Sequence, residues 1–187
     1  MNEEYISTQI AVYKNSKTLL EFHDKLKVAS MYSYAHIHAD GEDNGDGRRK
    51  HSLIGILMKD YSGGTGDKAV TVKANISPEE AKFILSRITT GFSEYTFQQE
   101  KIFGQKDEKG YAQVTKVRFI RALKDSKGNA RKIPWYVEVE NGKGIPLKNA
   151  TGGTYMKSGS FISTGKVYAN LTDLDLFKLL SRVSSYI

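Results

Sequence analysis

The chain has 187 residues, a net charge of +7 and no cysteine. This length can bury a real core in one domain or two small ones, and the lack of cysteine excludes disulfides and thiolate metal sites. No apolar run approaches the roughly 20 residues of a membrane-spanning helix, and the first residues, "MNEEYISTQ", are too polar for a signal peptide. We therefore expect a soluble, cytoplasmic protein that does not contact a membrane.

Positive charge is concentrated in the second half of the chain. Residues 1–95 contain 12 Lys or Arg against 13 Asp or Glu, whereas residues 96–187 contain 16 against 8. An excess of positive charge on one part of a chain favours a polyanionic partner such as nucleic acid. The same excess is also typical of a surface that only keeps a protein soluble.

In the first half, four segments separated by Gly- and Asp-rich turns have the composition of strands: residues 5–14, 27–39, 51–61 and 68–74. The segment "NSKTLLEFHDKL" at 15–26 fits either a hairpin or a short helix. Ser77 then predicts a helix N-cap, with Pro78 at the first helical position. An apolar stripe at helical spacing follows, at Ala81, Ile84, Leu85 and Ile88.

The second half has the same order of elements. Four segments again have the composition of strands: residues 94–104, 112–123, 132–140 and 161–169. Thr172 predicts the N-cap of a second helix, and Asp173 and Asp175 lie in its first turn. The apolar stripe of this helix is Leu176, Leu179, Leu180 and Val183.

The two helical regions repeat one phrase at a fixed offset. "ANISPEEAKFILSRI" at 74–88 recurs 95 residues later, without a gap, as "ANLTDLDLFKLLSRV" at 169–183. Two amphipathic helices could converge on such a likeness, but matching caps and helix ends favour an internal repeat. We therefore predict an α+β fold of two tandem ββββα units, residues 1–93 and 94–187. Their antiparallel sheets would be joined by centrally packed helices as an internal pseudo-dimer.

One helix for every four strands can cover only one face of each sheet, which leaves the other face open. In "MYSYAHIHAD" the strand alternation would direct Tyr and His side chains to the same side. Aromatic rings beside cations suit single-stranded nucleic acid, because bases stack on rings and phosphates pair with Lys and Arg. Strand tyrosines are also ordinary packing residues.

From this pattern we predict contacts with nucleic acid from the aromatic, histidine and basic side chains of the expected open faces and loops. The candidate residues are Tyr32, Tyr34, His36, His38, Arg48, Arg49, Lys50, Tyr95, Phe97, Lys101, Lys116, Arg118, Arg131, Lys132 and Tyr136. The expected function is binding of single-stranded nucleic acid with low sequence specificity, with single-stranded DNA favoured over RNA.

The tandem ββββα plan, with its "AN-x₉-LSR" repeat, resembles the Whirly-type single-strand-binding fold. It is also similar to the transcriptional positive-cofactor proteins, which pair one such unit in a dimer, and to Pur-type repeats. The resemblance implies curved sheets that present aromatic and basic residues to single-stranded DNA or RNA, with helices that pair the units. It covers most of the chain at the level of architecture and supplies no motif from which single residues can be carried over.

Other functions remain open from the sequence. In the general character of its sequence, the chain resembles small accessory proteins of bacterial mobile elements. A protein-binding inhibitor of the anti-CRISPR kind is therefore one alternative. His36 and His38 could also serve as acid and base in a small ribonuclease, or help to hold a metal. We expect neither role, and therefore no enzyme activity, metal or cofactor. Whether the protein assembles into homo-oligomers stays open.

Overall fold

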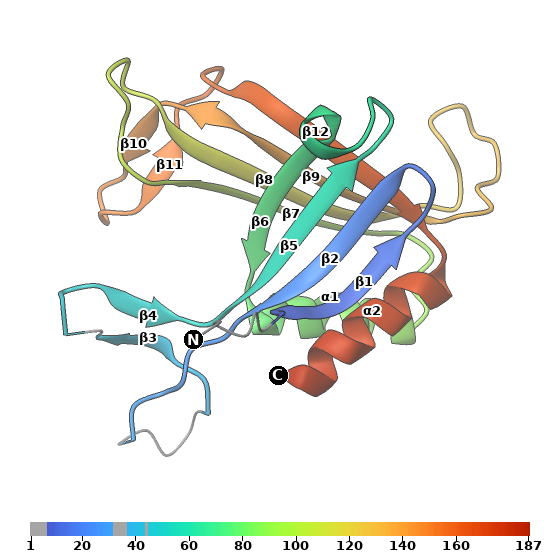
Figure 1. The fold of residues 1–187 in the computed structure, drawn as a ribbon, viewed down its shortest axis with the longest axis horizontal. Helices are drawn as coiled ribbons and strands as arrows, with labels where there is room; N and C mark the ends of the chain where they lie inside the picture. The colour runs from blue at the N-terminus through green and yellow to red at the C-terminus, as the bar shows by residue number, and fades with distance from the viewer. Residues whose placement is uncertain (1–6, 32–36, 44) are drawn as a thin grey trace.

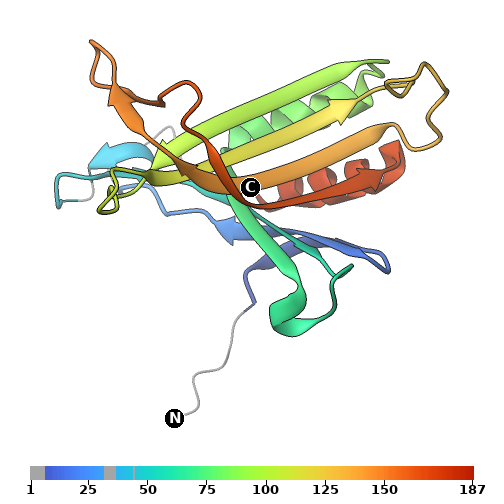
Figure 2. The ribbon, with the colours of Figure 1, turned by 90° about the horizontal axis from the view of Figure 1, so that it is seen from above.

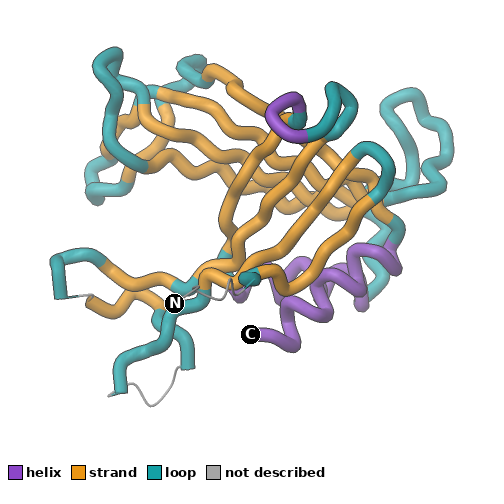
Figure 3. Tube along the Cα trace, viewed as in Figure 1, coloured by secondary structure: helices purple, strands orange, loops and turns teal. Residues whose placement is uncertain are grey.

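The computed structural model describes residues 7–31, 37–43 and 45–187. Two four-stranded antiparallel sheets dominate it, and each is followed by one helix (Figures 1 and 3). The first unit contains β1 (Gln9–Lys14), β2 (Thr18–Lys25), β5 (Leu53–Asp60), β6 (Val70–Ile76) and α1 (Pro78–Thr89). The second contains β7 (Tyr95–Phe103), β8 (Ala112–Arg121), β9 (Trp135–Gly144), β12 (Ile162–Leu171) and α2 (Asp173–Tyr186).

The strand order is β1-β2-β5-β6 in the first sheet and β12-β9-β8-β7 in the second, so each sheet is a meander. Each unit also carries one small two-stranded hairpin: β3 (Asp40–Asp43) with β4 (Arg49–His51), and β10 (Pro146–Lys148) with β11 (Thr154–Met156). A short 3₁₀ turn, η1 (Gly66–Lys68), precedes β6. Figures 1 and 2 show that both hairpins lie at the same end of the molecule, away from α2. The predicted tandem ββββα fold is confirmed.

The two helices begin in the same way because their caps repeat. Ser77 accepts a hydrogen bond from the Glu80 backbone N–H, and the Glu80 side chain accepts one from the Ser77 N–H. Thr172 and Asp175 make the same reciprocal pair at the start of α2. Such a capping box satisfies two backbone donors that would otherwise lack a helical partner. Both N-caps agree with the sequence prediction.

A single core joins the two units. The covered faces of the two sheets and the inner stripes of both helices meet in one cluster, in which α1 also contacts α2. Its largest fully buried side chains include Trp135, Phe22 and Phe119. The repeated helix stripe is buried at Ala81 and Ile84 in α1, and at Leu176, Leu179, Leu180 and Val183 in α2. The helices therefore hold the two units together, as expected.

The predicted strand at 27–39 is wrong, because β2 at Thr18–Lys25 takes the second position of the first sheet. The segment left ambiguous at 15–26 supplies this strand. Leu20 and Phe22, both fully buried, give β2 the large apolar side chains that a central strand needs. The 27–39 segment offers mostly Ser and Ala at its apolar positions. The described ends of the 27–39 segment pair with each other only through an isolated antiparallel β-bridge between Val28 and His38.

The two sheets cross one another, and each keeps one face open (Figure 2). At the crossing, the edge strand β6 lies against β9: the Asn141 side chain accepts from the Lys73 backbone N–H at 2.8 Å and donates to the Lys73 carbonyl at 2.7 Å. The exposed polar groups of an edge strand are thus paired by a side chain of the other sheet. Among the described residues, no helix is long and apolar enough to cross a membrane.

Candidate nucleic-acid interface

A groove opens beside the crossing of β6 and the second sheet, beyond the edge of the core. Its walls are the open face of the first sheet and the ends of β7, β8 and β9 that extend beyond the helices. Two adjoining cavities of about 460 Å³ and 340 Å³ form it, and they share Asn75, Phe103 and Thr115. We call this region the inter-sheet groove.

The inter-sheet groove is strongly basic. Four lysines line it, two from the first sheet and two from the second: Lys25, Lys73, Lys101 and Lys143. Among the described residues of its lining, Glu100 is the only carboxylate. Glu100 is already paired with Lys116 on β8 at 3.2 Å. Lys143 lies 3.2 Å from Asp107 in an exposed ion pair, which water and salt weaken. The groove thus carries a local excess of positive charge that suits phosphates.

Two exposed rings line the groove, Phe103 where its two cavities adjoin and Tyr155 in the larger one. Phe103, at the end of β7, is 46% exposed, and Tyr155, on β11, is 49% exposed. They come together because the β10–β11 hairpin folds back against β7. Exposed rings beside cations are the combination on which unpaired bases stack.

Amide side chains also line the groove. Asn75 accepts a hydrogen bond from the Lys25 Nζ at 2.8 Å across Gly55. A Cβ at Gly55 would lie 3.0 Å from the Lys25 Cε, so glycine leaves the lysine stem room to cross the sheet. Gln113 and Asn141 lie on the opposite wall. The groove therefore offers hydrogen-bonding groups as well as charge and rings.

The open face of the second sheet is different, because its cations are already paired. Glu138 is only 2% exposed and lies 3.3 Å from Arg118 Nη1 and 2.8 Å from Lys166 Nζ. Lys116 pairs with Glu100 and also lies 3.8 Å from the Phe161 ring centre. Charge on this face is therefore largely balanced within the protein. We call it the outer face of the second sheet.

Two tyrosines stack on this outer face. The rings of Tyr136 and Tyr168 are 5.3 Å apart and 24° from parallel, and Tyr168 is 52% exposed. The Tyr136 hydroxyl donates to Glu138. Burial and this hydrogen bond to a carboxylate raise the pKa of Tyr136 far above its usual value, so the phenol stays protonated.

The twelve predicted contact residues that the structure describes do not form one site. Of these twelve, Lys101 alone lines the inter-sheet groove, whereas Lys116, Arg118 and Tyr136 lie on the outer face of the second sheet. Arg131 and Lys132 lie in the loop between β8 and β9, and Arg131 donates to Asn170 of β12 at 3.2 Å. Arg48, Arg49 and Lys50 lie on and beside β4, outside both surfaces.

The open-face assignment of Tyr95 and Phe97 is wrong. Both rings pack against the core, Tyr95 edge-on to Trp135 at 6.2 Å and Phe97 edge-on to Phe119 at 6.1 Å. The cause is that α1 covers this part of β7. Lys101 shares their side of the strand, but it lies past the helix and therefore reaches the groove.

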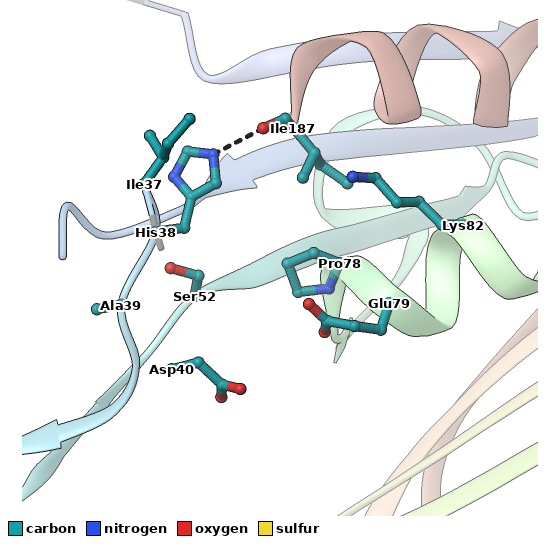
Figure 4. A pocket seen from close by; sticks show the side chains of 9 residues that line it. All are labelled: Ile37, His38, Ala39, Asp40, Ser52, Pro78, Glu79, Lys82 and Ile187. Carbon is teal, nitrogen blue, oxygen red and sulfur yellow. Dashed lines mark hydrogen bonds between the residues drawn. The ribbon is translucent and has the colours of Figure 1, made fainter. Parts of the chain in front are cut away.

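Of the predicted Tyr and His row, Tyr32, Tyr34 and His36 lie outside the described residues. His38 lies beside the end of α2, where its Nε2 is 2.8 Å from a main-chain oxygen of Ile187 (Figure 4). The cavity beside His38, of about 300 Å³, is also lined by Asp40, Glu79 and Lys82. Within the described ranges, no group of three or more His, Asp or Glu side chains could hold a metal ion.

Sequence reasoning missed most of the groove. The signal for β6 was present, since Thr71, Lys73 and Asn75 alternate with the buried Val72, Ala74 and Ile76. Tyr155 and Lys143 gave no such signal, because only the crossing of the sheets and the fold of the β10–β11 hairpin bring them to the groove.

Comparison with known proteins supports the architecture. No protein-family model matches the chain, and no curated protein matches its sequence. Among solved structures, the fold is similar to that of the plant transcriptional regulator PBF-2, a Whirly protein. The TM-score is 0.51 and the identity 12%, over 99% of this chain and 89% of the PBF-2 chain. The protein therefore has a Whirly-like fold, as the tandem repeat led us to expect.

Proposed function

We propose that this protein binds single-stranded nucleic acid in the inter-sheet groove, with low sequence preference and with DNA favoured over RNA. The observation that carries the proposal is the groove lining, which combines four lysines with two exposed rings. Lysines would neutralise phosphates while Phe103 and Tyr155 stack on bases, and every base has a face that can stack. The Whirly-like fold agrees with this function.

A duplex suits this lining less well. Stacking on Phe103 and Tyr155 needs bases whose faces are accessible, and paired bases inside a helix are covered by their neighbours. We therefore expect the protein to prefer single strands to duplex. We further propose that it binds without cleaving, since Nε2 of the His38 ring is already occupied by its contact with the Ile187 backbone oxygen and is not free to exchange a proton with a bound strand.

The test is fluorescence anisotropy with labelled single-stranded DNA, the same sequence as RNA, and the matching duplex, each at two salt concentrations. Phe103→Ala and Tyr155→Ala should each weaken binding to the single strand by about 1–3 kcal/mol, the contribution of one stacked base. Phe177→Ala removes a ring of similar exposure, 38%, from α2 and should leave binding unchanged. Equal losses of affinity from all three variants would rule out binding in the inter-sheet groove. Tighter binding to the duplex than to the single strand would contradict the proposed preference for single strands.

A further inference from the structure

The outer face of the second sheet carries a second arrangement suited to a nucleobase. Tyr168 on β12 presents an exposed ring that is stacked on Tyr136 of the neighbouring strand β9. A ring already supported on one side keeps its orientation, so a base adding to the stack loses little further freedom. The remaining face of such a pair is the natural position for another flat aromatic group.

The contacts below this pair hold it in position. The Tyr136 hydroxyl donates to Glu138, whose carboxylate is buried beneath Arg118 and Lys166. Three donors on one buried carboxylate form a charge-assisted network, which is stronger and more directional than neutral hydrogen bonds. Tyr136 is thereby fixed, and Tyr168 is presented on a rigid base.

One cation beside the pair, Arg131, makes no direct ion pair among the described residues and could therefore meet a phosphate. Arg131 donates to Asn170, which lies two residues from Tyr168 on the same side of β12. Within the described part of the chain, Arg131 makes no direct ion pair and only the more distant Asp125 of the same loop is within its electrostatic reach, whereas Arg118 and Lys166 share Glu138 directly. Recognition here would therefore depend on stacking, with one phosphate contact.

We propose that Tyr168, supported by Tyr136 and flanked by Arg131, is a stacking site for an unpaired nucleobase, separate from the inter-sheet groove. This inference rests on the proposed binding of single strands. The ligand is a base with an accessible face and an adjoining phosphate, which excludes the interior of a duplex. Glu138 holds Arg118 and Lys166 away from phosphates, so that this surface binds the base more than the backbone.

The first experiment measures binding of a labelled oligo-dT by anisotropy. Tyr168→Ala should weaken binding about fivefold or more, the lower end expected for one stacked base, whereas Tyr168→Phe keeps the ring and should bind like the parent chain. Equal affinity of parent and Tyr168→Ala would overturn the stacking site while the groove stands. Failure of the parent chain to bind any single strand would instead reject the proposed function, and this inference with it.

The second experiment locates the base directly and needs no variant of the outer face. A single strand containing 5-iodouracil, irradiated in complex with Phe103→Ala/Tyr155→Ala, should form an adduct at Tyr168 that peptide mapping identifies. The groove rings are absent from this protein, so they cannot supply the adduct. Labelling that omits Tyr168 would overturn the proposal.

The third experiment tests the part assigned to Glu138. Glu138→Gln keeps an acceptor for the Tyr136 hydroxyl but frees Arg118 and Lys166 for phosphates. A plot of log affinity against log salt should become steeper by roughly 0.7 for each freed cation that meets a phosphate, with tighter binding at low salt. An unchanged slope would mean that no phosphate approaches these side chains, which would contradict a strand on this face.

Discussion

Asp173 links three parts of the structure through one carboxylate. It accepts two hydrogen bonds from Arg121 of β8, both at 2.9 Å, and one from the Trp135 indole at 2.6 Å. Arg121 also donates to the carbonyls of Phe92 and Ser93, in the loop after α1. Asp173 therefore ties the start of α2 to the second sheet and, through Arg121, to the end of the first unit.

Acid pH should remove the contribution of Asp173. Hydrogen bonds from Arg121 hold its pKa below the ordinary value of 3.8. A carboxyl whose pKa is lowered on folding stabilises the protein above its unfolded pKa, and this contribution is lost as the pH falls. Asp173→Asn should therefore lower the free energy of unfolding in urea at pH 7 by about 1–2 kcal/mol, less than is typical of hydrogen bonds to a charged group because the Asp173 side chain is about half exposed. The difference should shrink by pH 3, and a constant difference would contradict this assignment.

At the scale of elements, the two units have equivalent helices but hairpins inserted at different positions. The caps of α1 and α2 are equivalent, and both helices pack into one core. The inserted hairpins are not equivalent: β3–β4 follows the second strand of its sheet, whereas β10–β11 follows the third. Among the described residues of the two hairpins, only those of the second reach the inter-sheet groove, Tyr155 among them.

Equivalent caps should contribute equally to stability. Ser77→Ala and Thr172→Ala each remove the side chain that accepts from the third helical residue, and each should cost about 1 kcal/mol. Ser185→Ala, at an exposed position within α2, is the matched control and should change stability by a few tenths of a kcal/mol at most. Urea denaturation measures all three. A cost at only one cap would show that the two helices do not contribute equivalently.

Glycines permit the close approach of the 157–161 segment to the outer face of the second sheet. A Cβ at Gly142 would lie 2.4 Å from the Ile162 carbonyl oxygen, and one at Gly144 would lie 2.5 Å from the Met156 sulfur. The Gly142 contact is with backbone and leaves no room for a side chain, whereas at Gly144 the Met156 side chain would have to move. Glycine at these positions thus lets the β10–β11 hairpin and Phe161 fold over the end of the sheet.

At the scale of the whole molecule, the sequence predicted the architecture better than the site. The helix caps, the repeat and all four strands of the second sheet are local patterns, and the sequence predicts each of them correctly. Pairing between strands is not local, so Leu20 and Phe22 displaced the predicted strand at 27–39. Tyr95 and Phe97 alternate as expected, but alternation cannot tell which face a helix covers. The groove depends on the crossing of two sheets, which no single segment encodes.

The most direct test of the account is the salt dependence of single-strand binding. Affinity for oligo-dT should fall with salt with a log–log slope of about −3, since each of four neutralised phosphates contributes roughly −0.7. The triple change of Lys25, Lys73 and Lys101 to Gln should reduce the magnitude of that slope by about 2. The same change at Lys68, Lys127 and Lys178 alters net charge equally at exposed positions outside the groove lining and should leave the slope near its original value. Equal slopes for the two triple variants, or binding that does not respond to salt, would contradict a polyanion in the inter-sheet groove.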